Sequence, residues 1–107
     1  MKWRITFYNK KVKSQILAFP EGVLASFLHI AELVEEYGPY IGMPYTRTLG
    51  SGLLEIRARG KEGIARVIFC VLPGSELVML SAFIKKSRKT PKKEIAIAKR
   101  RMREVMK

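Results

Sequence analysis

The stretch LEIRARGKEGIARVIFCVLPGSELVMLSAFIKK, residues 54–86, decides the fold. It contains one run of alternating apolar and charged residues, 54–59, and two mainly apolar runs, 64–72 and 77–86, separated by Gly60-Lys61-Glu62-Gly63 and Pro73-Gly74-Ser75. Short apolar runs between glycine- and proline-containing turns are typical of consecutive hairpins. The stretch therefore predicts three strands in an antiparallel meander.

The residues before this stretch predict one strand and two helices. Residues 3–8 alternate apolar and polar side chains, which is the period of a strand with one buried face. A short helical segment is expected around residues 14–18. From Pro20 to Tyr37, apolar residues recur at spacings of three and four, as in an amphipathic helix, and Gly38-Pro39 ends it.

Two further segments complete the chain. Residues 40–52 hold several glycines and prolines without a sustained period, and we interpret them as a long connection. Thr90 is expected to cap a C-terminal helix that starts at Pro91. The apolar stripe of that helix is Ile95, Ala98, Met102 and Val105.

The element order β-α-α-β-β-β-α predicts an α+β fold. We expect a twisted antiparallel sheet with the N-terminal helices packed on one face, the other face partly wet, and a basic C-terminal helix. The chain has 107 residues, of which 48% are hydrophobic, enough for one core but not two. Residues 1–107 are therefore interpreted as a single domain.

The charge is strongly positive, with 21 Lys and Arg against 9 acidic residues and a formal net charge of +12. Residues 85–107 alone hold 11 basic residues and two Glu. An excess of this size favours a polyanionic partner: RNA, DNA or an anionic membrane surface. Every acidic residue is Glu, which disfavours divalent-metal chemistry, and we expect neither a metal nor a cofactor.

Several other classes of function find no support in the residues. No Ser-His-Asp set, Cys-His pair or phosphate-binding glycine loop can be assembled. Cys70 lies in an apolar run and is interpreted as a core residue, and His29 as a structural or surface residue. The longest apolar stretch, residues 64–72, is interrupted by Arg66 and too short to span a bilayer. We expect a cytoplasmic protein without a membrane partner.

The meander brings basic residues together. Alternation places Arg57 and Arg59 on one face of their strand, and Arg66 lies among apolar neighbours, where a guanidinium needs a carboxylate, a carbonyl or a phosphate. Phe83, Lys85 and Lys86 follow at the end of the last strand. Two interpretations stay open here. In the first, these residues form a concavity that binds an anion. In the second, Arg57 and Arg59 are solvated, Arg66 pairs with Glu55, and the basic C-terminal segment only improves solubility.

The segments YGPYIGMPYTRTLGSGLLEIRARGKEGIARVIF (37–69) and LSAFIKKSRKTPKKEIAIAKRRM (80–102) resemble the phage-related HigB branch of the RelE toxin superfamily. The resemblance implies a RelE-like fold and the toxin of a type II toxin–antitoxin system. Such a toxin is a ribosome-dependent endoribonuclease that cleaves mRNA and inhibits translation. Its partners would be mRNA, the ribosome and a helix-turn-helix antitoxin of the HigA type.

In this class the RNA 2′-hydroxyl attacks the adjacent phosphorus without a metal, which leaves a 2′,3′-cyclic phosphate and a 5′-hydroxyl. We assign Arg57 and Arg66 to the phosphate and its transition state, with Arg59 as a helper. Lys85 or Lys86 is the candidate for proton transfer, because neighbouring cations lower a lysine pKa. The candidate RNA-binding residues, by base stacking or by backbone contacts, are Phe83, Lys89, Lys92, Lys93 and Arg100.

The chain departs from the best-known RelE enzymes in one respect, since it has no tyrosine after Tyr45 to act as their C-terminal catalytic tyrosine. Two alternatives to the nuclease therefore stay open. One is a ParE-like toxin that inhibits DNA gyrase without catalysis. The other is a basic nucleic-acid-binding module with no enzymatic activity.

Overall fold

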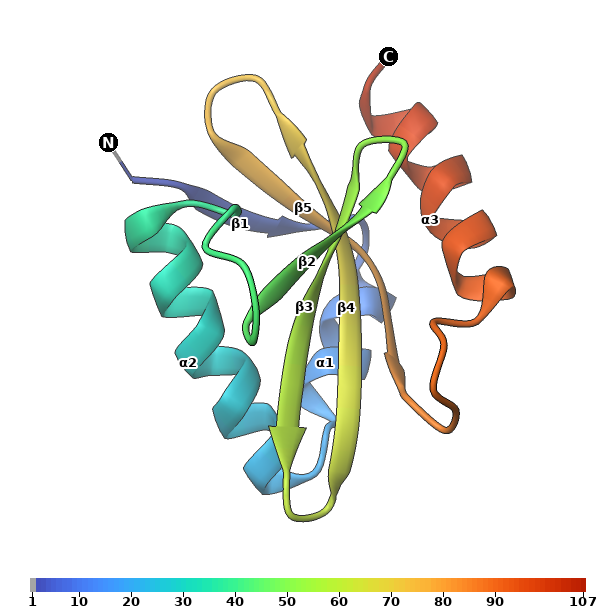
Figure 1. Ribbon diagram of the computed structural model, residues 1–107. Helices are drawn as coiled ribbons and strands as arrows, with labels where there is room; N and C mark the ends of the chain where they lie inside the picture. The colour runs from blue at the N-terminus through green and yellow to red at the C-terminus, as the bar shows by residue number, and fades with distance from the viewer. Residues whose placement is uncertain (1) are drawn as a thin grey trace.

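The computed structural model describes residues 2–107, which form one mixed sheet with helices on both faces (Figure 1). In chain order the elements are β1 (Arg4–Phe7), α1 (Lys10–Leu17), α2 (Glu21–Tyr37), β2 (Thr46–Gly50), β3 (Leu53–Gly60), β4 (Gly63–Leu72), β5 (Glu76–Ile84) and α3 (Lys92–Val105). The predicted α+β class is confirmed.

The strands lie in the order β1-β5-β4-β3-β2. The predicted antiparallel meander of β3, β4 and β5 is confirmed, and β2 adds a further antiparallel strand at the edge. The expectation of a wholly antiparallel sheet is wrong, because β1 pairs with β5 in parallel, with Arg4 opposite Glu76. No hairpin joins these two strands, so local sequence does not set their relative direction.

The segment 40–52 is not the uninterrupted loop that its glycines suggested. Thr46–Gly50 forms β2, and Thr46 lies opposite Ile56 of β3. Gly50, Ser51 and Gly52 have φ angles of 89°, 56° and 86° and form the turn into β3. Because glycine adopts positive φ without steric strain, these glycines mark a tight hairpin turn rather than an irregular connection.

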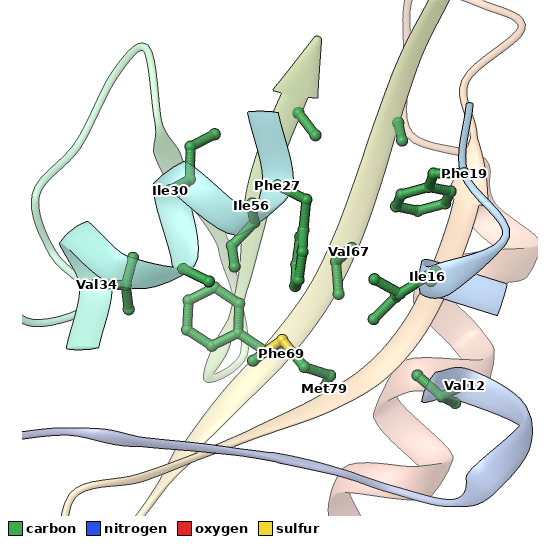
Figure 2. Packing of buried hydrophobic residues seen from close by; sticks show 14 of the residues in the cluster. Val12, Ile16, Phe19, Phe27, Ile30, Val34, Ile56, Val67, Phe69 and Met79 are labelled. Atoms are coloured by element: carbon green, nitrogen blue, oxygen red, sulfur yellow. The ribbon is translucent and has the colours of Figure 1, made fainter. Parts of the chain in front are cut away.

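Helices α1 and α2 cover one face of the sheet and bury the main hydrophobic core (Figure 2). Asn9 caps α1 by accepting a hydrogen bond from the Val12 backbone N–H at 2.9 Å. The apolar stripe of α2, including Phe27 and Val34, packs against β3, β4 and β5, from which Phe69 and Met79 project. Burial of these side chains is the main source of the stability of this face.

Helix α3 covers part of the opposite face. Its predicted apolar stripe packs over a smaller cluster that includes Leu53, Ile68 and Leu80. Arg101 Nη1 also donates a hydrogen bond of 2.7 Å to the Leu80 carbonyl. Along residues 2–107, no helix combines the length and apolar character needed to cross a membrane. The part of this face that α3 leaves uncovered holds the charged side chains described next.

Candidate functional site

Two arginines and one aromatic residue lie side by side across three strands. Arg57 of β3 is directly opposite Arg66 of β4, and Arg66 is directly opposite Phe83 of β5. Directly paired residues project from the same face of a sheet, so the meander gathers these side chains on the α3 side. Two adjacent guanidinium groups would repel one another without a counter-charge.

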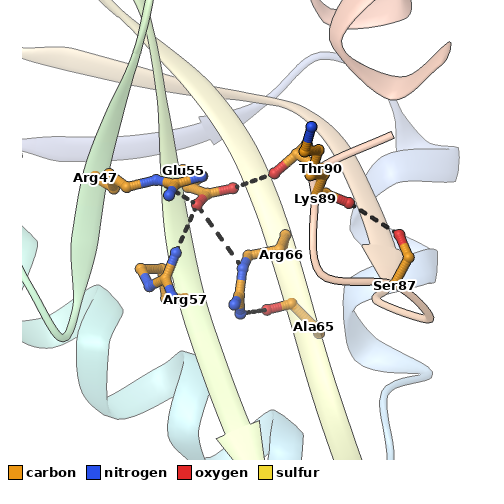
Figure 3. Close-up of polar contacts among 8 residues, drawn as sticks. All are labelled: Arg47, Glu55, Arg57, Ala65, Arg66, Ser87, Lys89 and Thr90. Atoms are coloured by element: carbon orange, nitrogen blue, oxygen red, sulfur yellow. Dashed lines mark hydrogen bonds and ion pairs between the residues drawn. The ribbon is translucent and has the colours of Figure 1, made fainter. Parts of the chain in front are cut away.

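That counter-charge is Glu55, around which the arginines gather (Figure 3). Its side chain is 0% exposed. Its Oε2 atom lies 2.9 Å from Arg57 Nη1, 3.2 Å from Arg47 Nε and 3.8 Å from Arg66 Nε. A buried carboxylate is tolerated when cations and hydrogen-bond donors surround it. Glu55 therefore organises the arginines, and the pairing with Arg66 that the sequence left open is present as a long contact.

Thr90 supplies a further donor to this carboxylate. Its hydroxyl donates a hydrogen bond of 3.0 Å to Glu55 Oε1. The expectation that Thr90 caps α3 is therefore wrong. Pro91 occupies the cap position, the helix begins at Lys92, and no side chain in the described part of the chain caps it. The Thr90 hydroxyl instead donates to the buried carboxylate. This hydrogen bond connects the segment between β5 and α3 to β3.

Arg66 is the most deeply placed of the arginines, with a side chain only 3% exposed. Its Nη1 donates to the Ala65 carbonyl at 3.1 Å, while its buried Nε has no hydrogen-bond partner among residues 2–107. Burial and the adjacent Arg57 lower the pKa of Arg66, and Glu55 opposes that effect. A guanidinium remains protonated at neutral pH all the same, so Arg66 is a buried cation at the base of the site.

A hollow of about 510 Å³ opens above Arg66. We call it the basic groove, and it is lined by Arg57, Arg59, Ile64, Arg66, Lys85, Lys86, Ser87 and Arg88. The structure thus brings together the five basic residues of β3, β4 and the end of β5 that the sequence singled out. A concavity lined by cations concentrates positive potential and suits a phosphate.

Lys85 differs from an ordinary surface lysine. Partial burial lowers its pKa, and the nearby cations Arg66 and Arg57 lower it further. The sequence pointed to repulsion between like charges as the cause, whereas loss of hydration contributes more. Lys86 is exposed at the same rim. The groove therefore combines fixed guanidinium groups with an amine that loses its proton more readily than a free lysine.

The other predicted RNA-binding residues lie outside the lining of the groove. Phe83 is half-buried and packs against the cluster beneath α3. The remaining four side chains are exposed, on the segment before α3 or on α3 itself: Lys89, Lys92, Lys93 and Arg100. Within residues 2–107, none of these four side chains lines the basic groove.

Sequence reasoning did not single out Arg47 or Arg88, and it gave Thr90 the role of a helix cap rather than a contact with Glu55. Arg47 was missed because β2 was interpreted as loop, although the alternation of Thr46 and Thr48 around it is a strand signal. Arg88 was missed because it lies in the basic segment 85–93, whose sequence shows no helix or strand period that would indicate where its side chain points. Within residues 2–107 there is no group of three or more His, Cys, Asp or Glu side chains placed to hold a metal.

The fold is similar to that of a protein of known structure. The structure is similar to a chain of the crystal structure of the archaeal RelE–RelB complex from Pyrococcus horikoshii OT3, with a TM-score of 0.59 and 22% sequence identity. The similarity covers 83% of this chain and 100% of that one. The fold is RelE-like, as the sequence resemblance predicted.

The family follows from the sequence match. Residues 14–103 match the family described as phage derived protein Gp49-like (DUF891), and the chain belongs to that family. A comparison with curated protein sequences found no match. The RelE-like fold that the resemblance predicted is confirmed, and the matched family is phage-derived, as the resemblance to phage-related proteins implied.

Proposed function

We propose that this protein is the toxin of a toxin–antitoxin system and cleaves mRNA on the ribosome. The observation that carries the proposal is the basic groove, in which a buried carboxylate holds arginines beside a lysine of lowered pKa. Membership of the phage-derived family and the RelE-like fold support it. Cleavage in the cytoplasm, where ribosomes lie, follows from the same proposal.

The proposed reaction is transfer of the phosphoryl group within the RNA. The 2′-oxygen forms a bond to the adjacent phosphorus as the bond from phosphorus to the 5′-oxygen breaks. Arg57 and Arg59 bind the nonbridging oxygens, and Arg66 adds its charge from the floor of the groove. These cations stabilise the extra negative charge of the transition state, which is the main demand of this chemistry.

Proton transfer in this reaction requires two further groups, a base for the 2′-hydroxyl and an acid for the 5′-oxygen. Lys85 in its neutral form accepts the proton of the 2′-hydroxyl, because its lowered pKa makes that form accessible. The ammonium of Lys86 donates a proton to the departing 5′-oxygen. This pair takes the place of the tyrosine that the chain lacks after Tyr45.

The surface around the groove would hold the substrate assembly. Lys89, Lys92, Lys93 and Arg100 are exposed and contact the backbone of ribosomal RNA in this proposal. Phe83 stacks on a base only if the segment after β5 moves, because its ring packs beneath α3. A helix-turn-helix antitoxin of the HigA type restrains the enzyme.

The decisive experiment adds the purified protein to a translating extract and maps the ends of a reporter message. We expect new 3′ ends that carry a 2′,3′-cyclic phosphate and new 5′ ends that carry a hydroxyl. An intact message at saturating protein would overturn the proposal. Inhibition of DNA gyrase in a parallel assay would then assign the chain to the ParE-like alternative.

The antitoxin is tested separately. The reading frames beside this gene are searched for a small helix-turn-helix protein, which is then co-expressed with this chain. We expect a stable complex and loss of cleavage on binding. Absence of a complex would contradict the toxin–antitoxin assignment without bearing on catalysis.

A further inference from the structure

A second hollow adjoins the basic groove. It has a volume of about 320 Å³ and lies between α2, the segment before β2, and β3. We call it the helix-side pocket, and its lining residues other than arginine are Ser26, His29, Ile30, Met43, Pro44 and Tyr45. Arg57, Arg59 and Arg66 line both hollows. The same arginines therefore face an open basic groove and a more apolar pocket.

The walls of the helix-side pocket suit a flat ring. The Tyr45 ring lies edge-on to His29, with centroids 6.4 Å apart and planes at 74°. Ile30, Met43 and Pro44 add apolar surface. Proteins that hold single-stranded RNA place unstacked bases against aromatic and apolar side chains of this kind.

Two polar groups in the pocket are free to contact a ligand. Ser26 Oγ accepts a hydrogen bond of 2.9 Å from the Arg59 backbone N–H, which leaves its hydroxyl hydrogen available. The imidazole of His29 is exposed, and no hydrogen bond to it is recorded within residues 2–107. A few placed polar groups in an apolar pocket are the usual basis of ligand specificity.

The pocket is also preformed, because α2 is fastened to the β3–β4 hairpin. The Gly22 N–H donates to Glu62 Oε2 at 3.0 Å. At Gly60 the backbones approach so closely that a Cβ atom would lie 2.6 Å from Gly22 C and Val23 N. Binding to rigid walls avoids the entropy loss of ordering them.

We propose that the helix-side pocket binds the base of the ribonucleotide whose phosphate occupies the basic groove, and that Ser26 and His29 determine which base is preferred. The arginines common to both hollows favour an occupant that joins an anion to a flat ring. This inference rests on the proposed function, since it assigns the base-recognition site of that nuclease.

The test is a backbone-amide NMR titration of the full chain with each of the four ribonucleoside 3′-monophosphates, and with ribose 5-phosphate as the base-free probe. Nucleotides should shift amides of Ser26, His29 and Tyr45 in addition to those of the groove, whereas ribose 5-phosphate should shift groove amides alone. The inference is overturned if the nucleotides and ribose 5-phosphate perturb the same amides.

His29→Ala and Met43→Ala provide the variants, since both side chains are exposed and the fold does not need them. We expect nucleotide affinity to fall about tenfold while affinity for ribose 5-phosphate is unchanged. Leu28→Ala and Tyr40→Ala are the matched controls, exposed but outside the pocket. An equal loss of nucleotide affinity in the pocket variants and in the controls would contradict the inference.

Message cleavage separates this inference from the proposed function. If the wild-type chain cuts message, His29→Ala should still cut but with a weaker preference for the bases beside the cut. An unchanged preference refutes the base pocket and leaves the nuclease standing. If the wild-type chain cuts nothing, the nuclease fails, and the NMR titration still decides whether the pocket binds a base.

Discussion

The two faces of the sheet are built from the same strands by different forces. On the side of α1 and α2, β3 and β4 present only apolar residues such as Ile56, Val67 and Phe69, all 0% exposed. On the other side the same strands present Glu55, Arg57 and Arg66, and α3 covers only the neighbouring apolar cluster. Apolar packing determines the side-chain arrangement on the face under α1 and α2. Ion pairs determine it on the part of the opposite face that α3 leaves uncovered.

The comparison teaches where function is to be sought. Burying ions is expensive even when they are paired, and apolar residues of similar volume often give equal or greater stability. The charged region is therefore not explained by stability alone. Perturbed pKa values at Lys85 and Arg66, in a concave region, are instead typical of functional sites.

The largest effect should come from breaking the apolar face. Phe69→Ala removes a fully buried ring, and we expect the free energy of unfolding in urea to fall by about 4 kcal/mol. Phe83→Ala, on the charged face and only half-buried, should lower it by less than half as much. Equal losses would mean that both faces depend on packing to the same degree.

Removing the central carboxylate should have the next largest effect. Glu55→Gln keeps the shape but leaves Arg57 and Arg66 without their counter-charge, so we expect a loss of about 3 kcal/mol in urea unfolding. Glu36→Gln, an exposed change of the same kind, should stay within about 0.5 kcal/mol of wild type. No difference between the two variants would refute the organising role of Glu55.

Lys85 allows a test by pH. Only its neutral form accepts a proton, so single-turnover cleavage should rise with pH and level off below the ordinary lysine value of 10.5, because the pKa is lowered. Lys85→Ala should slow cleavage about 100-fold and abolish this rise. Lys61→Ala, an exposed change in the β3–β4 turn, should leave the profile intact. The same profile in Lys85→Ala would exclude this lysine as the base.

The smallest expected effect concerns the tie between β3 and the segment before α3. Thr90→Val removes the hydroxyl that donates to Glu55, and we expect a loss of about 1 kcal/mol in the free energy of unfolding. Thr48→Val, exposed on β2, is the control and should change little. If the two variants have the same free energy of unfolding, the Thr90 hydrogen bond contributes nothing to stability.

Much of the fold was predictable because its signals are local. Alternation and the turns at Gly60–Gly63 and Pro73–Ser75 placed β3, β4 and β5 to within two residues. The parallel pairing of β1 with β5 was not predictable, since it joins segments about 70 residues apart without a local signal. Strand β2 was missed because its turn glycines dominate the pattern of that segment.

The candidate site was predictable to the same extent. Strand alternation and register gather Arg57, Arg66 and the lysines after β5, as the sequence indicated. The contribution of Arg47 depends on the missed strand, and that of Thr90 on a carboxylate buried by the finished fold. The contact of Thr90 has no signal in the local sequence, whereas the alternation of Thr46 and Thr48 could have placed Arg47 on a strand.

The most direct test of the account is message cleavage by two double variants of equal charge. Arg59→Ala with Lys86→Ala removes two exposed cations of the basic groove, whereas Lys11→Ala with Arg103→Ala removes two exposed cations elsewhere. We predict that the groove variant cuts a reporter message at least about 100-fold more slowly in a translating extract, while the control cuts like wild type. Equal cleavage by the two variants would contradict the claim that the charged face of the sheet is the catalytic site.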